Sequence, residues 1–202
     1  MKIVIFDLFG TIITEGNVIS NGLLPVVLSN VPDKELNLAA VKKNYNTYVL
    51  GKVSTARFIH DLSVKDKKLA KKIKSEFFNM FELDKDFVPV YNYLKRKYRM
   101  ALLSNTSSDL WVFLAKKYNL PKKFYKTFTS AKLKTIKPKY KIYRMVNRAL
   151  GKNNELYFVD DRLENLKSAK HFGWKTIWMK RLSQDERFKP DYTITSLRQL
   201  KR

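Results

Sequence analysis

The chain has 202 residues, of which 45% are hydrophobic and 13% aromatic, a composition typical of a globular protein with a sizeable core. Lysine and arginine number 41 against 18 aspartate and glutamate residues, so the formal net charge is +23 at pH 7. There is no cysteine and no long apolar run, which excludes disulfide bonds, cysteine-ligated metals and a transmembrane helix; we therefore expect a cytoplasmic protein with no signal peptide and no membrane contact.

The first segment, residues 1–7, is almost wholly apolar and β-branched, and it predicts a buried strand that Gly10-Thr11 ends. In parallel α/β sheets ligands bind outside the carboxyl ends of the strands. Asp7 therefore stands where a reaction centre is expected. An aspartate after a strand is also a common turn former or helix cap, and that alternative stays open at this point.

Residues from about 14 to 84 predict helices only. One helix face is predicted between a start signal at Pro32-Asp33 and a stop signal at Gly51. Its members are Leu38, Val41, Tyr45 and Tyr48. Ser54 and Ser63 are suited to cap the next two helices, the second of which is rich in lysine. No strand-like run interrupts this block, so it is interpreted as a helical insertion.

Two polar motifs follow predicted core elements in the second half of the chain. Residues 87–98 predict a helix leading into a strand at 100–103, and Ser104-Asn105 follows that strand. Lys137-Pro138 precedes a helical pattern that Gly151 ends, with the proline expected in the first turn. Each motif, taken alone, is also explained as an ordinary helix start.

Asp160-Asp161 follows a third apolar run, residues 156–159, and precedes a helix that contains Asn165. Two adjacent acids at a strand end repel one another unless they are protonated or neutralised by a cation. The alternative is that the pair caps the helix beginning near Leu163. The pair is the strongest indication of a metal site in this sequence.

An acid, a small hydroxyl, a lysine and an acid pair, in this order after strands or at helix starts, resemble the four motifs of the haloacid dehalogenase (HAD) superfamily. The resemblance implies an α/β fold: a three-layer Rossmann-like core with a parallel sheet, plus an inserted all-helical cap of the C1 type found in subfamily I. The expected boundaries are 1–13 and 85–202 for the core and 14–84 for the cap.

The resemblance also implies roles for these residues. Asp7 would be the nucleophile that forms a covalent aspartyl intermediate, Ser104 would hydrogen-bond the transferring group, and Lys137 would supply positive charge. The implied ligands are hard oxygens, which favour Mg²⁺. They are the carboxylates of Asp7 and Asp161, the backbone carbonyl of Phe9, and Asp160 as a ligand or as the partner of one.

Phe9 departs from the phosphatase pattern, in which a second aspartate two residues after the nucleophile transfers protons. Haloacid dehalogenases carry an aromatic residue at this position and a Ser-Asn second motif, which Ser104-Asn105 matches. Dehalogenases of this family work without metal and lack the acid pair, however. We therefore expect a magnesium-dependent phosphohydrolase of a small phosphorylated metabolite, with a metal-free 2-haloacid dehalogenase acting on a haloacid as the first alternative.

Substrate contact is expected from Phe9 and Asn105, and from Lys52 and Arg57 beside the Gly51 turn. Basic stretches interleaved with aromatic residues allow nonspecific nucleic-acid contact, so a second alternative is a catalytically weak HAD-fold protein that binds nucleic acid or a protein through its basic surface. The lysines at 65–74 alternate with an apolar helical face, which favours solvent-facing charge instead.

Overall fold

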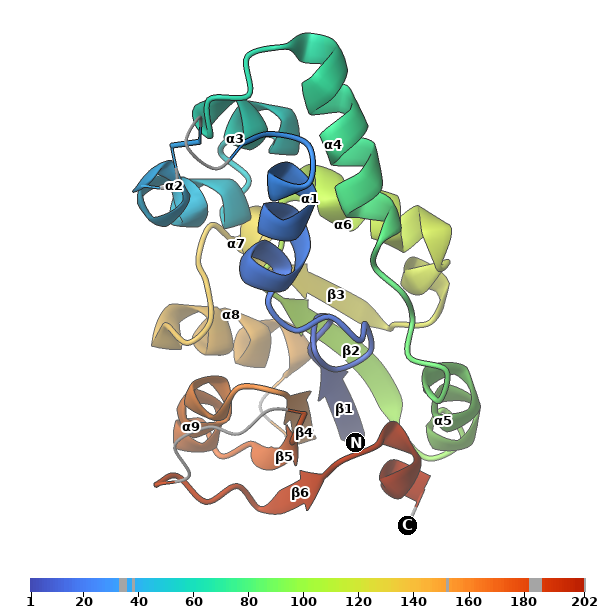
Figure 1. The fold of residues 1–202 in the computed structure, drawn as a ribbon. Coiled ribbons are helices and arrows are strands. Elements are labelled where there is room, and N and C mark those ends of the chain that lie inside the picture. The colour runs from blue at the N-terminus through green and yellow to red at the C-terminus, as the bar shows by residue number, and fades with distance from the viewer. Residues whose placement is uncertain (33–35, 38, 152, 182–186, 202) are drawn as a thin grey trace.

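The computed structural model describes residues 1–32, 36–37, 39–151, 153–181 and 187–201. In these ranges six parallel strands form one sheet in the order β3-β2-β1-β4-β5-β6 (Figure 1). The strands are β1 (Lys2–Phe6), β2 (Arg99–Ser104), β3 (Lys126–Thr129), β4 (Glu155–Asp160), β5 (Lys175–Met179) and β6 (Tyr192–Ile194). The predicted parallel α/β sheet is confirmed, with β1 at its centre between β2 and β4.

Helices cover both faces of this sheet. One face packs against α8 (Tyr140–Leu150) and α9 (Leu163–His171), and the other against α5 (Phe87–Leu94) and α6 (Ser108–Lys117). Side chains of β1 alternate between the two cores: Val4 and Phe6 belong to the second, and Ile3 and Ile5 to the first. The strand is therefore buried on both faces, as its continuous apolar sequence indicates.

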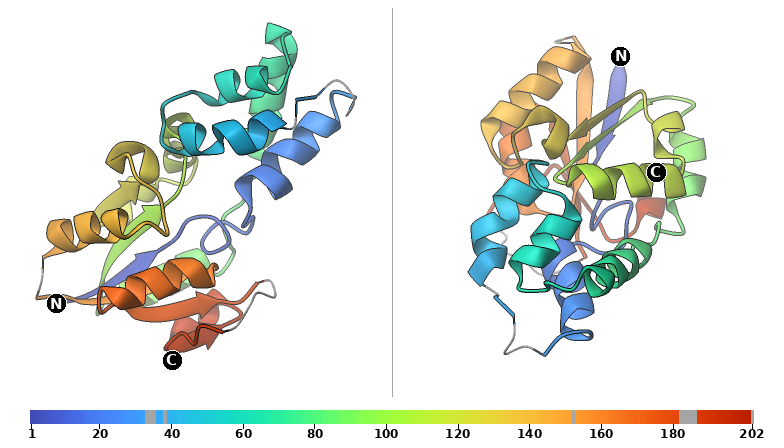
Figure 2. Two further views of the ribbon diagram at one scale, coloured as in Figure 1. Left: turned by 90° about the vertical axis from the view of Figure 1, so that its left-hand side faces the viewer. Right: turned by 90° about the horizontal axis from the view of Figure 1, so that it is seen from above.

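The segment between β1 and α5 is mainly helical and stands beyond the carboxyl ends of the strands (Figures 1 and 2). It contains the π-helical turn η1 (Val18–Leu23), α1 (Leu24–Leu28), α2 (Ala39–Val49), α3 (Thr55–Asp61) and α4 (Lys67–Asn79). We call these elements, from Val18 to Asn79, the helical block. Ser54 caps α3 as predicted, but the prediction for Ser63 is wrong: Asp66, three residues later, accepts the backbone N–H of Leu69 and caps α4. Asp33 and Leu38 lie outside the described residues.

Other short elements complete the core. They are η3 (Leu120–Lys122), α7 (Ser130–Leu133) and η4 (Leu197–Lys201). The proline prediction is wrong in detail, since α8 begins at Tyr140 and Pro138 lies in the turn before it. No helix within the described ranges is long and apolar enough to cross a membrane.

Asp109, in the first turn of α6, fastens the helical block to the core. Its carboxylate accepts hydrogen bonds from the backbone N–H of Thr55 at 3.1 Å and from the Thr55 hydroxyl at 2.9 Å. Lys74 of α4 forms an ion pair with the same carboxylate at 2.9 Å. One core side chain thus holds both α3 and α4.

We expect Asp109→Ala to lower the free energy of unfolding by about 1–3 kcal/mol, because it takes an acceptor from the buried Thr55 and the half-buried Lys74. The matched control, Lys72→Ala, breaks the exposed Lys72–Glu76 pair and should change stability by less than about 1 kcal/mol. Urea unfolding of both variants measures the difference. Equal effects would contradict the fastening role of Asp109.

Candidate active site

The motif residues meet at the carboxyl ends of the central strands, beneath the helical block. Asp7 directly follows β1, Ser104 ends β2 and Asp160 ends β4. Of these three residues, Asp7 lines a cavity of about 300 Å³ between the core and the helical block. From the core it is lined by Asp7, Phe9, Asn105, Lys137, Asp161, Arg162 and Asn165, and from the segment after β1 and the block by Gly16, Asn17, Val18 and Tyr45.

Lys137 joins two of the three acids. Its buried ammonium group lies 2.8 Å from Asp7 Oδ1 and 2.7 Å from Asp160 Oδ2. Burial lowers the pKa of Lys137, but the charges of Asp160 and Asp7 more than offset this and hold the pKa above its ordinary value. The lysine is therefore a fixed positive charge at neutral pH.

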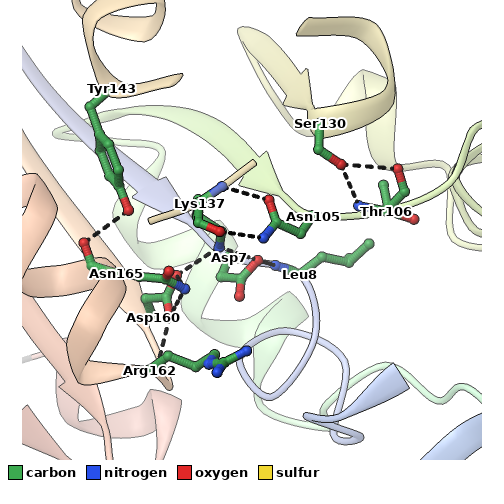
Figure 3. Close-up of polar contacts among 10 residues, drawn as sticks. All are labelled: Asp7, Leu8, Asn105, Thr106, Ser130, Lys137, Tyr143, Asp160, Arg162 and Asn165. Atoms are coloured by element: carbon green, nitrogen blue, oxygen red, sulfur yellow. Dashed lines mark hydrogen bonds and ion pairs between the residues drawn. The ribbon is translucent and has the colours of Figure 1, made fainter. Parts of the chain in front are cut away.

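Asn105 sets the position of that lysine. Its side-chain amide donates to the backbone carbonyl of Lys137 and its side-chain oxygen accepts the Lys137 N–H, both at 2.9 Å (Figure 3). The amide is thus committed to Lys137 even though Asn105 lines the cavity. Ser104 is buried next to it, and its hydroxyl has no hydrogen-bond partner among the described residues. Ser104 was expected to hydrogen-bond the transferring group, but it is not among the residues that line the cavity.

Asp160 is saturated by the protein. Its Oδ1 accepts the backbone N–H of Arg162 at 2.8 Å and the amide of Asn165 at 2.9 Å, and its Oδ2 accepts Lys137 (Figure 3). Tyr143 in turn donates to the carbonyl of Asn165 at 2.9 Å. Of the two metal roles expected for Asp160, this geometry favours the partner of a ligand over the ligand itself.

Asp161 lies against the loop that follows β1. A Cβ atom built on Gly10, whose φ is +69°, would stand 2.3 Å from Asp161 Oδ2, so only glycine leaves room for this carboxylate. Trp178 donates to the Asp161 carbonyl at 3.0 Å. Arg181 holds the same loop by donating to the carbonyls of Gly10 at 2.8 Å and Thr11 at 3.0 Å.

The three acids form a cluster that fits a divalent cation. Carboxylate oxygens of Asp7, Asp160 and Asp161 lie within 4.8 Å of one another. With Lys137, three carboxylates and one ammonium carry a formal charge of −2 when all are ionised. Burial and the charges of Asp160 and Asp7 raise the pKa of Asp161 to about 8. Lys137 alone leaves the fully ionised cluster two charges negative, so ionisation of all three acids needs a further cation, and their hard oxygens suit Mg²⁺.

Asp7 retains one oxygen for chemistry. Its Oδ1 accepts the backbone N–H of Leu8 at 2.7 Å as well as Lys137, whereas no described residue hydrogen-bonds Oδ2. Burial raises the pKa of Asp7 to about 7, with Lys137 opposing and Asp160 adding to the rise. The carboxylate is held in one orientation by contacts on one side only.

The structure does not bring every predicted contact residue to the cavity. Lys52 and Arg57 are exposed and do not line it, and Arg57 pairs with Asp61 at 3.0 Å. Phe9 does line it, but the Phe9 ring is buried against Phe81 at a centroid distance of 5.2 Å.

Sequence reasoning missed Asn17, Tyr45 and Arg162 as cavity residues. Arg162 directly follows the acid pair, and that adjacency was the available signal. Tyr45 was assigned to a helix face without a site role, because a tyrosine at helical spacing among apolar residues does not differ from a core residue in sequence.

Comparison with known proteins agrees with this geometry. The model of the haloacid dehalogenase-like hydrolases matches residues 1–173, and the chain belongs to this family of hydrolases. A search of curated proteins finds no match.

Solved structures with the same fold include haloacid dehalogenases and a HAD family enzyme in complex with magnesium and inorganic phosphate. A 2-haloacid dehalogenase from Pseudomonas syringae pv. Tomato DC3000 is 18% identical, with a TM-score of 0.73 over 99% of this chain and 96% of that one. The L-2-haloacid dehalogenase from Xanthobacter autotrophicus with chloropropionic acid covalently bound is 18% identical, with a TM-score of 0.70 over 100% and 97%. A HAD family enzyme from Bacteroides thetaiotaomicron, in complex with magnesium and inorganic phosphate, is 20% identical, with a TM-score of 0.71 over 92% and 98%. At such identities these likenesses show the fold.

We expect Gly10→Ala to destabilise the protein more than Gly173→Ala does. Both glycines have positive φ, +69° and +77°, so both substitutions strain the backbone by about 1–2 kcal/mol. Only the Cβ at position 10 collides with Asp161, whereas the one at 173 meets nothing within 4 Å. Denaturant unfolding of both variants isolates the collision. Equal losses would contradict the packing of Asp161 against the loop.

Proposed function

We propose that the protein is a magnesium-dependent phosphohydrolase that acts on a small phosphorylated metabolite through an aspartyl-phosphate. The observation that carries the proposal is Asp161, a half-buried third carboxylate beside the buried Asp7 and Asp160, which would leave the fully ionised cluster more negative than Lys137 can balance. Asp7 and Asp161, with the backbone carbonyl of Phe9 by family resemblance, would hold the ion. When bound, Mg²⁺ supplies positive charge that neutralises these carboxylates and the phosphate oxygens.

The residues of the chain then divide the reaction between them. Asp7 attacks phosphorus through its carboxylate, the bond to the leaving oxygen breaks, and an acyl phosphate forms. Lys137 reduces the repulsion between the carboxylate and the anionic substrate, and Asn105 keeps the lysine in place. Water then attacks the phosphorus of the intermediate, which releases phosphate and restores the Asp7 carboxylate.

The second candidate is a metal-free 2-haloacid dehalogenase. Phe9 favours it, because a halide leaves without a proton and needs no acid at that position. Two of the structurally similar enzymes described above are dehalogenases, and one of them holds chloropropionic acid covalently. Asp161 argues against it, because a third carboxylate beside Asp7 and Asp160 has no part in that reaction.

The basic-surface alternative has less support. Neither the family nor the fold favours nucleic-acid contact. On α4, Lys67, Lys68, Lys71 and Lys72 are exposed while Ile73 and Phe77 are buried, which is the arrangement of an amphipathic helix with a solvent-facing charged side.

Mg²⁺ should stabilise the wild-type protein against thermal unfolding, by about 2.7 kcal/mol at a free concentration 100 times its dissociation constant. Asp161→Asn should raise stability without Mg²⁺, because it removes a repelled charge, and should abolish the gain from Mg²⁺. Glu164→Gln, an exposed acid paired with Arg162, is the matched control and should keep the gain. A wild type that Mg²⁺ does not stabilise would contradict the metal site.

Phosphate release from activated phosphate esters should require Mg²⁺ and should disappear in Asp7→Asn, since an amide keeps the shape of the carboxylate but forms no acyl phosphate. Halide release from 2-haloacids is measured in parallel, with Mg²⁺ and with a chelator. Halide release that a chelator does not affect, together with no phosphate release from any ester, would establish the dehalogenase instead.

A further inference from the structure

The proposed phosphohydrolase, on which this inference rests, lacks its proton donor at the usual place. An alkoxide is a poor leaving group, and a positioned acid that protonates it contributes about 10²–10⁴ in rate. The side chain of Phe9 has no proton to give and packs against Phe81. A substrate with an alkyl leaving group therefore needs a donor elsewhere around the cavity.

Most polar groups lining the cavity are already committed. Lys137 binds Asp7 and Asp160, and the amide of Asn165 binds Asp160. The guanidinium of Arg162 is paired with Glu164 at 2.7 Å. Asp161 belongs to the cation cluster. Among the described residues that line the cavity, the hydroxyl of Tyr45 remains.

Tyr45 lines the cavity from the helical block. It lies on α2, half buried, and its hydroxyl makes no hydrogen bond to a described residue. Burial raises the pKa of Tyr45, while the positive charge of Arg162 opposes the rise. The phenol thus keeps its proton at neutral pH, and a cation stands near enough to stabilise the phenolate when it forms.

We propose that Tyr45 is the acid and base that replaces the missing aspartate. As Asp7 bonds to phosphorus and the phosphorus–oxygen bond of the ester breaks, the Tyr45 hydroxyl gives its proton to the leaving oxygen, which departs as an alcohol. The phenolate takes a proton from the water that attacks the acyl phosphate. Phosphate leaves, and Asp7 and Tyr45 both return to their starting states.

This role specifies a substrate class. The cavity measures about 300 Å³, and Phe9, Val18 and Tyr45 contribute two hydrocarbon side chains and one phenol to its wall. A phosphate monoester of a small alcohol presents one bridging oxygen to that wall. The proposal therefore favours alkyl phosphate monoesters over substrates whose leaving group needs no proton, such as acyl phosphates.

Tyr45→Phe tests the proposal because it removes one oxygen atom and keeps the ring. Turnover of the magnesium-loaded variant is compared with the wild type on ethyl phosphate and on p-nitrophenyl phosphate. We expect kcat for ethyl phosphate to fall by about 10²–10⁴, and kcat for p-nitrophenyl phosphate to fall far less, because nitrophenolate leaves without a proton. Across esters of graded leaving-group pKa, the rate of the variant should depend more steeply on that pKa.

A merely structural role for Tyr45 predicts a different pattern. It would lower both rates equally or act on KM, and either result overturns the proposal, as does an unchanged rate on ethyl phosphate. Tyr93→Phe, at an exposed tyrosine on α5, is the matched control. The stabilisation by Mg²⁺ should be the same in Tyr45→Phe and the wild type, which shows that the cluster is intact. A wild type that releases no phosphate from either ester refutes the proposed function itself, and this inference with it.

Discussion

The contact of Lys137 with Asp7 and Asp160 is the interaction on which the rest of the site depends. β1 and β4 are neighbouring strands of a parallel sheet, so the acids at their carboxyl ends lie close together even though their negative charges repel. Without the buried ammonium, the ionised carboxylates would repel one another in a region where water does not screen them. The supports of Lys137 follow from this need: Asn105 fixes its backbone, and Asn165 and the Arg162 N–H orient Asp160 toward it.

The central strands and the motif residues were predictable because their signals are local. Residues 1–7 and 156–159 are continuous apolar runs, and the acids that follow them must meet at one edge of a parallel sheet. The two edge strands gave weaker signals: β3 is the short segment KTFT and β6 is the mostly exposed YTI, neither of which alternates or runs apolar for long. Their pairing depends on neighbours distant in sequence.

The predicted site residues have local sequence signals, whereas the positions of the missed ones depend on contacts distant in sequence. Asp7, Lys137 and Asp161 act where their own strands or turns place them. The cavity position of Tyr45 depends instead on how α2 is placed over the core, which the hydrogen bonds of Tyr48 with Thr55 and of Ser130 with the Val49 carbonyl help to determine. Lys52 and Arg57 illustrate the error in the other direction. Positive charge near a turn suggested phosphate contact, but Gly51 packs closely on Ser108 and Ala131, and neither Lys52 nor Arg57 lines the cavity.

Phe9 and Asp161 therefore carry different weight in deciding the chemistry. Phe9 is accounted for by packing against Phe81, and a missing acid at one position can be replaced by a donor from another element. Asp161 differs because it brings a third ionisable group into the acid cluster. Its carboxylate occupies space that only a glycine at position 10 leaves open, and it adds negative charge to a cluster that already exceeds its one lysine. Burying an additional charge costs free energy that a bound cation returns, and a haloacid, itself an anion, does not. Asp161 is therefore stronger evidence for a bound cation than Phe9 is against one. An ionised Asp161 costs free energy without the cation, whereas Phe9 packs against Phe81 in either case.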